Sequence, residues 1–290
     1  MSQQATNAPS PSLSLGDAFK GQWSGFLFGT TALAIAYAGT IQSMVADWMT
    51  DDNASHGFFV PLVSGYLIWL QKSDLSETKV EPANTGFPVA LAAVTMLILG
   101  DIASERYVTR LSILVALAGC ILFWLGKGVL RRLLAPLCYL LFMIPLPAIV
   151  LNAVTMPLKL LVSAISVSTL RLLGIPVLRE GSIIMLPNIS LEVVEACSGL
   201  RSLESLLALA AAYALIFQRS AVGRTLLITA AVPIAIFANI VRVVVTGLLA
   251  RGMGASAAEG FFHESAGIAV FILALAMLAG LHRLMRKSFP

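Results

Sequence analysis

The feature that most constrains this chain is a succession of long apolar segments with few charged residues between them. Of its 290 residues, 58% are hydrophobic and only 12% are charged. A soluble domain carries about 25% charged residues. A helix needs about 20 apolar residues to cross the hydrocarbon core of a bilayer. We therefore interpret the chain as a polytopic membrane protein. This excludes a secreted disulfide scaffold, a nucleic-acid-binding protein and a conventional soluble enzyme.

Eight segments are apolar enough to be interpreted as membrane helices. The predicted fold is all-α, with about eight transmembrane helices and a small extracytoplasmic insertion made of a helix and a hairpin. Residues 1–22 are expected to be a disordered cytoplasmic tail, and residues 23–285 a single membrane-embedded domain. The eight segments are residues 24–46, 57–71, 86–101, 110–126, 133–150, 196–218, 225–249 and 262–282.

The positive charges indicate how the chain is oriented. With a cytoplasmic N-terminus, eleven of the 19 Lys and Arg residues fall in inside loops and six in outside loops. The other two, Arg201 and Arg242, lie within predicted spans. Short cytoplasmic loops are enriched in Lys and Arg. We therefore predict a multi-pass membrane protein with both termini in the cytoplasm.

The longest outside segment, residues 151–195, contains the predicted insertion. Its first part is apolar with a helical pattern but carries Lys159 and Arg171, which is typical of a helix at the membrane interface or of a re-entrant helix. Its second part has two β-prone runs around Pro187 and Asn188, which predict a small hairpin. This hairpin would come directly before Cys197.

Ionisable residues within spans are costly, so each one is a functional hypothesis. Arg201, Arg242 and His263 are the main examples, and Glu204 would pair with Arg201 one turn away. At 1.5 Å per residue, Arg242, His263 and Cys197 lie about 27, 30 and 33 Å from the cytoplasmic arginine at the other end of their helices. Each distance is close to the thickness of the hydrocarbon core. We therefore expect the three residues at one level near the outer face.

These three residue types are suited to thiol chemistry. A cysteine acts as a nucleophile when it is a thiolate, which a helix N-terminus and a nearby cation favour. His263 would take the proton of Cys197 and later give it to a leaving amine. Arg242 would donate hydrogen bonds to the oxyanion of a tetrahedral intermediate.

Each residue also has a structural alternative. Arg242 alone would extend to lipid phosphates, and His263 alone would be an interfacial histidine. The other two cysteines, Cys120 and Cys138, are interpreted as packing residues.

The stretch EACSGLRSL (195–203) resembles the exosortase/archaeosortase family of membrane-embedded cysteine transpeptidases. Four more stretches resemble motifs of this family in the same order: SHGFFVPLVSGYLIW (55–69), FMIPLP (142–147), NIVRVVVTG (239–247) and FFHESAGIAVF (261–271). The resemblance implies that Cys197, Arg242 and His263 are catalytic. It leaves Arg201, Glu195 and Asn239 as supporting residues and His56 as a candidate substrate contact.

The resemblance also implies a substrate class. The partners would be secreted proteins with a C-terminal sorting signal of the PEP-CTERM type, anchored in the same bilayer, often in organisms that make exopolysaccharide. The enzyme would cleave them through a thioester on Cys197, and no metal or organic cofactor is implied. Two alternatives remain: a polytopic transporter with a polar pathway lined by Arg201, Arg242 and His263, or a subunit of a polysaccharide-export assembly. Transporters often contain inverted repeats, and none is visible here.

Overall fold

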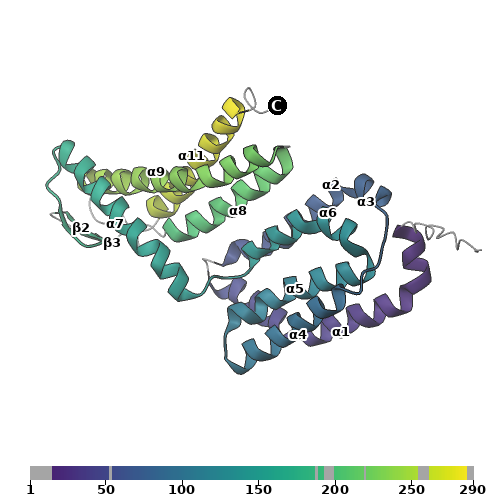
Figure 1. Cartoon of the computed structure of the whole chain (residues 1–290). Helices are drawn as coiled ribbons and strands as arrows, with labels where there is room; N and C mark the ends of the chain where they lie inside the picture. The colour runs from purple at the N-terminus through teal and green to yellow at the C-terminus, as the bar shows by residue number, and fades with distance from the viewer. Residues whose placement is uncertain are drawn as a thin grey trace, which may run out of the picture. The chain divides into compact units, whose positions relative to one another are not determined.

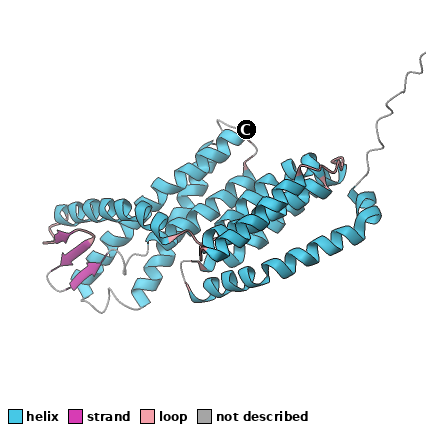
Figure 2. Ribbon diagram, turned by 60° about the horizontal axis from the view of Figure 1, so that its bottom comes forward, coloured by secondary structure: helices cyan, strands magenta, loops and turns pink. Residues whose placement is uncertain are grey.

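The computed structural model of this chain describes residues 15–51, 54–186, 189–192, 199–218, 220–253 and 261–285. The fold is mostly helical, with a small sheet late in the chain (Figures 1 and 2). The chain divides into two compact units. Unit 1 is formed by the described residues up to Thr50 and by Gly57–Ile144. Unit 2 is formed by the described residues of Asp51–His56 and from Pro145 onward.

Unit 1 is a group of helices joined by short connections. Its closest packing is between the two helices α4 and α5, where small residues let the backbones approach. A Cβ on Gly119 would lie only 2.6 Å from the backbone nitrogen of Ala90. Tyr37 of the long first helix packs against this pair in a core with Ala93 and Ala116. In chain order the elements are α1 (Leu15–Thr50), η1 (Ser55–Phe58), α2 (Phe59–Leu70), α3 (Lys72–Glu77), α4 (Gly86–Ile102), α5 (Arg106–Trp124), α6 (Gly126–Tyr139) and η2 (Leu140–Met143).

Unit 2 combines four long helices with the sheet. Its elements are α7 (Ala148–Leu172), β1 (Leu178–Glu180), β2 (Ile183–Leu186), β3 (Ile189–Glu192), α8 (Gly199–Phe217), α9 (Ala221–Met253) and α11 (Phe261–Met285). The N-terminal half of α9 packs in one core with the C-terminal parts of α8 and α11. The C-terminal half of α9 packs in a second core with α7 and strand β2. Helix α9 is therefore the common element of unit 2 (Figure 1).

A glycine ends α7 and directs the chain into the sheet. Gly174 adopts φ +73°, and its N–H donates to the carbonyl of Arg171 at 2.9 Å. The next N–H, of Ile175, donates to the carbonyl of Leu170 at 3.0 Å, which completes a glycine-based helix C-cap. Arg251, from the end of α9, donates to the carbonyl of Gly174 at 3.3 Å. The turn after α7 is thus held against α9.

The three strands, magenta in Figure 2, form an antiparallel sheet. The strand order is β1-β2-β3. Strands β2 and β3 form the hairpin predicted around Pro187 and Asn188, two residues that lie outside the described part of the chain. The first strand, β1, was not predicted. It pairs with β2 through a two-residue turn that contains Gly181, at φ +61°.

Five described helices are long and apolar enough to cross a membrane, by length and composition. They are Ser24–Thr50, Arg106–Trp124, Ala148–Leu172, Ala221–Gly252 and Ile268–Met285. Three more apolar helices are shorter: Ser55–Leu70, Gly86–Ile102 and Glu204–Phe217. Seven of the eight predicted spans correspond to one of these helices, four to long ones and three to short ones.

The remaining predicted span, residues 133–150, is not a single helix in the structure, so this prediction is wrong. Helix α6 ends at Tyr139, η2 ends at Met143, and α7 begins at Ala148. The interruption contains Pro145 and Pro147, and a proline disfavours helical geometry in the residue before it. The fifth long apolar helix is α7, for which the charges of Lys159 and Arg171 predicted an interfacial or re-entrant helix.

Candidate functional site

Arg242 is buried in the interior of unit 2. Its exposed fraction is 7%, although it carries a permanent positive charge. On α9 it lies between two hydrophobic cores. Ala238, four residues before it, belongs to the core shared with α8 and α11. Val243, the next residue, belongs to the core shared with α7 and the sheet. A buried guanidinium in an apolar helix is rare and is a functional-site hypothesis.

Two polar residues share the face of α9 that carries Arg242. Asn239 is half-buried one turn before it, and Thr246 is 3% exposed one turn after it. Residues three and four apart are neighbours on a helix, so these side chains form a polar stripe along an otherwise apolar helix. Thr246 was missed by the sequence analysis, although its spacing of four from Arg242 could have indicated it.

The packing of α8, α9 and α11 determines which of their ends lie together. The N-terminal half of α9 packs with the C-terminal parts of the other two helices. The start of α8, the C-terminal half of α9 and the start of α11 therefore extend to the same side of this core. Arg242 and His263 lie in these parts of α9 and α11, and Cys197 comes two residues before α8 in the sequence.

The spacing along each helix is consistent with a common level. Ala214, Leu227 and Leu278 are fully buried members of the shared core. Fifteen residues separate each of them from Gly199, Arg242 and His263 respectively. At the rise of an α-helix this is about 22 Å. Other members of the same core lie nearer: Leu206 is seven residues from Gly199, Ala238 four from Arg242 and Ala274 eleven from His263. A common level of the three positions therefore stays a prediction.

The structure describes the remaining predicted site residues unequally. Arg201 and His263 lie in the first turns of α8 and α11, and their side chains are outside the described part of the structure. Cys197 and Glu195 are outside the described residues altogether. The meeting of the Cys197, Arg242 and His263 side chains therefore stays a prediction.

His56 groups with unit 2 although it lies between two segments of unit 1. The short segment Asp51–His56 belongs to the compact unit that also contains Arg242 and α8. His56 is half-buried in η1. The substrate contact that the resemblance implied for His56 stays a prediction.

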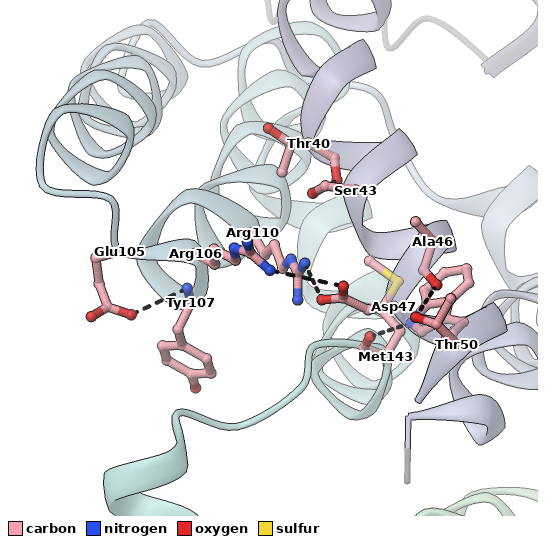
Figure 3. Close-up of polar contacts among 11 residues, drawn as sticks. Thr40, Ser43, Ala46, Asp47, Thr50, Glu105, Arg106, Tyr107, Arg110 and Met143 are labelled. Carbon is pink, nitrogen blue, oxygen red and sulfur yellow. Dashed lines mark hydrogen bonds and ion pairs between the residues drawn. The ribbon is translucent and has the colours of Figure 1, made fainter. Parts of the chain in front are cut away.

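A polar cluster in unit 1 was not predicted from the sequence. The Arg110 side chain is 3% exposed, and its Nη2 donates to Oδ2 of Asp47 at 2.5 Å, while Nη1 of Arg106 lies 3.9 Å from Oδ1 (Figure 3). A cavity of about 360 Å³ adjoins these residues, lined in part by Ser43 and Asp101. Its lining includes none of the predicted site residues. The sequence could have indicated this cluster, because Asp47 directly follows the predicted span 24–46 and Arg110 begins the predicted span 110–126.

Within the described residues, no group of three or more His, Cys, Asp or Glu residues is arranged to hold a metal ion. Cys120 and Cys138 are free thiols, half-buried and exposed respectively.

The apolar helices and the charged groups buried among them define a class, a polytopic helical membrane protein. The family described as transmembrane exosortase matches residues 48–280. Since this match covers most of the chain, the protein belongs to the transmembrane exosortase family. No curated protein and no solved structure matches the chain.

Proposed function

We propose that this protein is a membrane cysteine transpeptidase or protease that cleaves C-terminal sorting signals of secreted proteins. The substrates would carry a short Pro-containing motif of the PEP-CTERM type followed by a transmembrane helix. Cleavage would take place at the outer face of the bacterial inner membrane, with both termini of the enzyme in the cytoplasm. The lateral surface of the helices would admit the membrane-anchored part of the substrate.

The proposed reaction has two steps. His263 takes the proton of the Cys197 thiol, and the thiolate attacks the scissile carbonyl carbon to form a tetrahedral oxyanion that accepts hydrogen bonds from Arg242. The C–N bond then breaks, the leaving amine takes the proton from His263, and a thioester remains on Cys197. An acceptor amine or water attacks the thioester and gives a proton to His263. The C–S bond breaks, and His263 returns the proton to the Cys197 thiolate.

Arg242 is the observation that carries this proposal. It is a nearly inaccessible cation on α9, within the residues that match the family. It lies on the side of the core of α8, α9 and α11 where α8 and α11 have their N-termini. An arginine in this position is always charged and donates several hydrogen bonds in a fixed geometry. Those properties suit the stabilisation of an oxyanion in a water-poor site. Arg201, Glu195 and Asn239 would support the same site.

Processing of a tagged substrate would test the proposal. A secreted protein with a Pro-containing sorting signal is co-expressed with the enzyme, and its size is followed on a gel. We expect cleavage by the wild type and its loss in Cys197→Ala, Arg242→Ala and His263→Ala at matched membrane levels. Cys138→Ala is the matched control, because Cys138 is an exposed free thiol in unit 1. Cleavage that survives Cys197→Ala would overturn the covalent mechanism.

The transporter alternative is supported by the same buried charge. In that case, flux of a polar solute would depend on Arg242 but tolerate Cys197→Ala, since a pathway needs no nucleophile. The transpeptidase tolerates neither substitution. Cleavage by the wild type, together with solute flux in Cys197→Ala and Arg242→Ala, therefore separates the two functions.

A further inference from the structure

The sheet of unit 2 has a central strand that is packed in the core and an outer strand that comes shortly before Cys197 in the sequence. Strand β2 lies between β1 and β3. Its residues Ile184 and Leu186 are 0% and 8% exposed and belong to the core formed with α7 and α9. Strand β3 is held on this anchored strand by antiparallel pairing. Among the described residues, β3 has a strand neighbour on one side only.

The pairing register shows which backbone groups of β3 are directed to its other side. Leu186 pairs with Ile189 across a two-residue connection, and the residues that flank such a connection exchange both backbone hydrogen bonds. Hydrogen-bonded and non-hydrogen-bonded pairs alternate along an antiparallel ladder. Leu191 of β3 therefore exchanges its backbone hydrogen bonds with Ile184 of β2. The N–H and C=O groups of Ser190 and Glu192 are directed away from β2, to the outer edge of β3.

This edge is close to the proposed nucleophile along the chain. Glu192 ends β3, and Cys197 follows five residues later. Five residues span at most about 18 Å even when fully extended. A peptide paired with β3 would therefore place its scissile bond within a few residues of the paired segment.

The chemistry of the expected substrate favours this mode of binding. A residue that precedes proline is pushed toward extended backbone geometry, so a Pro-containing motif is already close to the conformation of a strand. An added strand gains affinity from main-chain hydrogen bonds and is therefore tolerant of side-chain variation. A sorting enzyme that processes many different proteins needs such tolerance outside its short motif.

We propose that the outer edge of β3 binds the substrate as an added strand, through the backbone groups of Ser190 and Glu192. The occupant is the extended segment of the sorting signal next to the scissile bond. This inference rests on the proposed function, because it takes Cys197 as the nucleophile.

Proline scanning of β3 in the full-length enzyme tests the inference. Ser190→Pro and Glu192→Pro each remove an N–H that the sheet does not use, and proline is tolerated at such edge positions. We expect each to reduce the rate of substrate processing at least tenfold. The matched controls Ser190→Ala and Glu192→Gln keep the N–H and should process within about twofold of wild type. Equal rates in the Pro variants and their controls would overturn the inference.

Two readouts keep the outcome independent of folding and of the proposed function. Labelling of Cys197 by a small water-soluble maleimide should be unchanged in the two Pro variants, which shows that the region is intact. A synthetic sorting-signal peptide, N-methylated at one residue at a time, should lose processing at alternate residues, because alternate N–H groups of an added strand face its neighbour. Loss at no position, or at consecutive positions, would contradict strand addition. Processing that survives Cys197→Ala would instead refute the proposed function itself.

Discussion

The indole Nε1–H of Trp48 donates a hydrogen bond to the backbone carbonyl of Met143 at 3.0 Å, across 95 residues of sequence. Met143 belongs to the stretch FMIPLP, and Trp48 also contacts the stretch that begins SHGFF: its ring lies edge to face on Phe58 at 5.2 Å. Two of the stretches that resemble family motifs therefore meet at one tryptophan. They contribute to the packing of unit 1, which contains none of the three predicted catalytic residues.

Gly57 is expected to be required for this contact. A Cβ on Gly57 would overlap the Trp48 indole, which is 7% exposed and cannot move away freely. Gly57→Ala should therefore lower the free energy of unfolding by about 1–3 kcal/mol, the usual cost of overpacking. The midpoint of thermal unfolding in detergent measures the change. Gly65→Ala in α2 is the control, because its Cβ would meet no atom within 4 Å; an equal loss in both variants would contradict this prediction.

The Asp47–Arg110 pair is expected to contribute more to stability than an exposed ion pair. Arg110 is 3% exposed, so Asp47→Asn leaves its charge without compensation. Breaking a fully buried pair in this way costs about 3–5 kcal/mol. Asp47 keeps 30% of its side chain exposed, so we expect a cost below that range and above that of an exposed pair.

The exposed pair of Arg132 and Asp74, 3.5 Å apart with more than half of each side chain exposed, is the matched comparison. Asp74→Asn should cost about 0–1 kcal/mol. Thermal unfolding of both variants, together with a double-mutant cycle of Asp47→Asn and Arg110→Met, measures the difference. A coupling energy near zero for Asp47 and Arg110 would show that the pair is not coupled.

Packing of α7 on α9 is expected to depend on Gly247. A Cβ there would lie 3.1 Å from Cδ1 of Leu170, which is fully buried. Gly247→Val adds more volume at this contact and should destabilise the protein by about 1–3 kcal/mol. Gly252→Val near the end of the same helix is the control, since a Cβ at Gly252 has no atom within 4 Å. Similar melting temperatures for the two variants would argue against a tight contact between α7 and α9.

Arg242 is expected to be needed for its hydrogen-bonding geometry as well as its charge. Arg242→Lys keeps the charge but loses the planar fork of donors. Removal of one oxyanion donor typically costs a factor of about 10²–10³ in kcat, and we expect a loss of this size in substrate processing at unchanged protein level. Arg251→Lys, at an exposed position on the same helix, should retain most of its activity. Full activity of Arg242→Lys would leave Arg242 with a purely electrostatic or structural role.

Much of the fold follows from local patterns in the sequence. Uninterrupted apolar segments predicted the apolar parts of α1, α4, α5 and α9, because hydropathy over about 20 residues depends on composition alone. The start of α1 at Leu15 was not predicted, since residues 1–22 were expected to be disordered. The hairpin of β2 and β3 was predicted from β-prone residues on both sides of Pro187 and Asn188. The position of Arg242 on an apolar helix was likewise evident from the sequence. Each of these features is set within a short stretch of chain.

The sequence by itself determined the membrane class, most of the helices and the candidate residues Cys197, Arg242 and His263. Only the tertiary structure decided that β1 completes the sheet and that Asp47 pairs with Arg110 across 63 residues. These features depend on which distant segments meet. Apolar helices of similar composition can pack against one another in many ways, so hydropathy alone does not select the partners. Shape complementarity at glycines and the need to satisfy buried charges select among them.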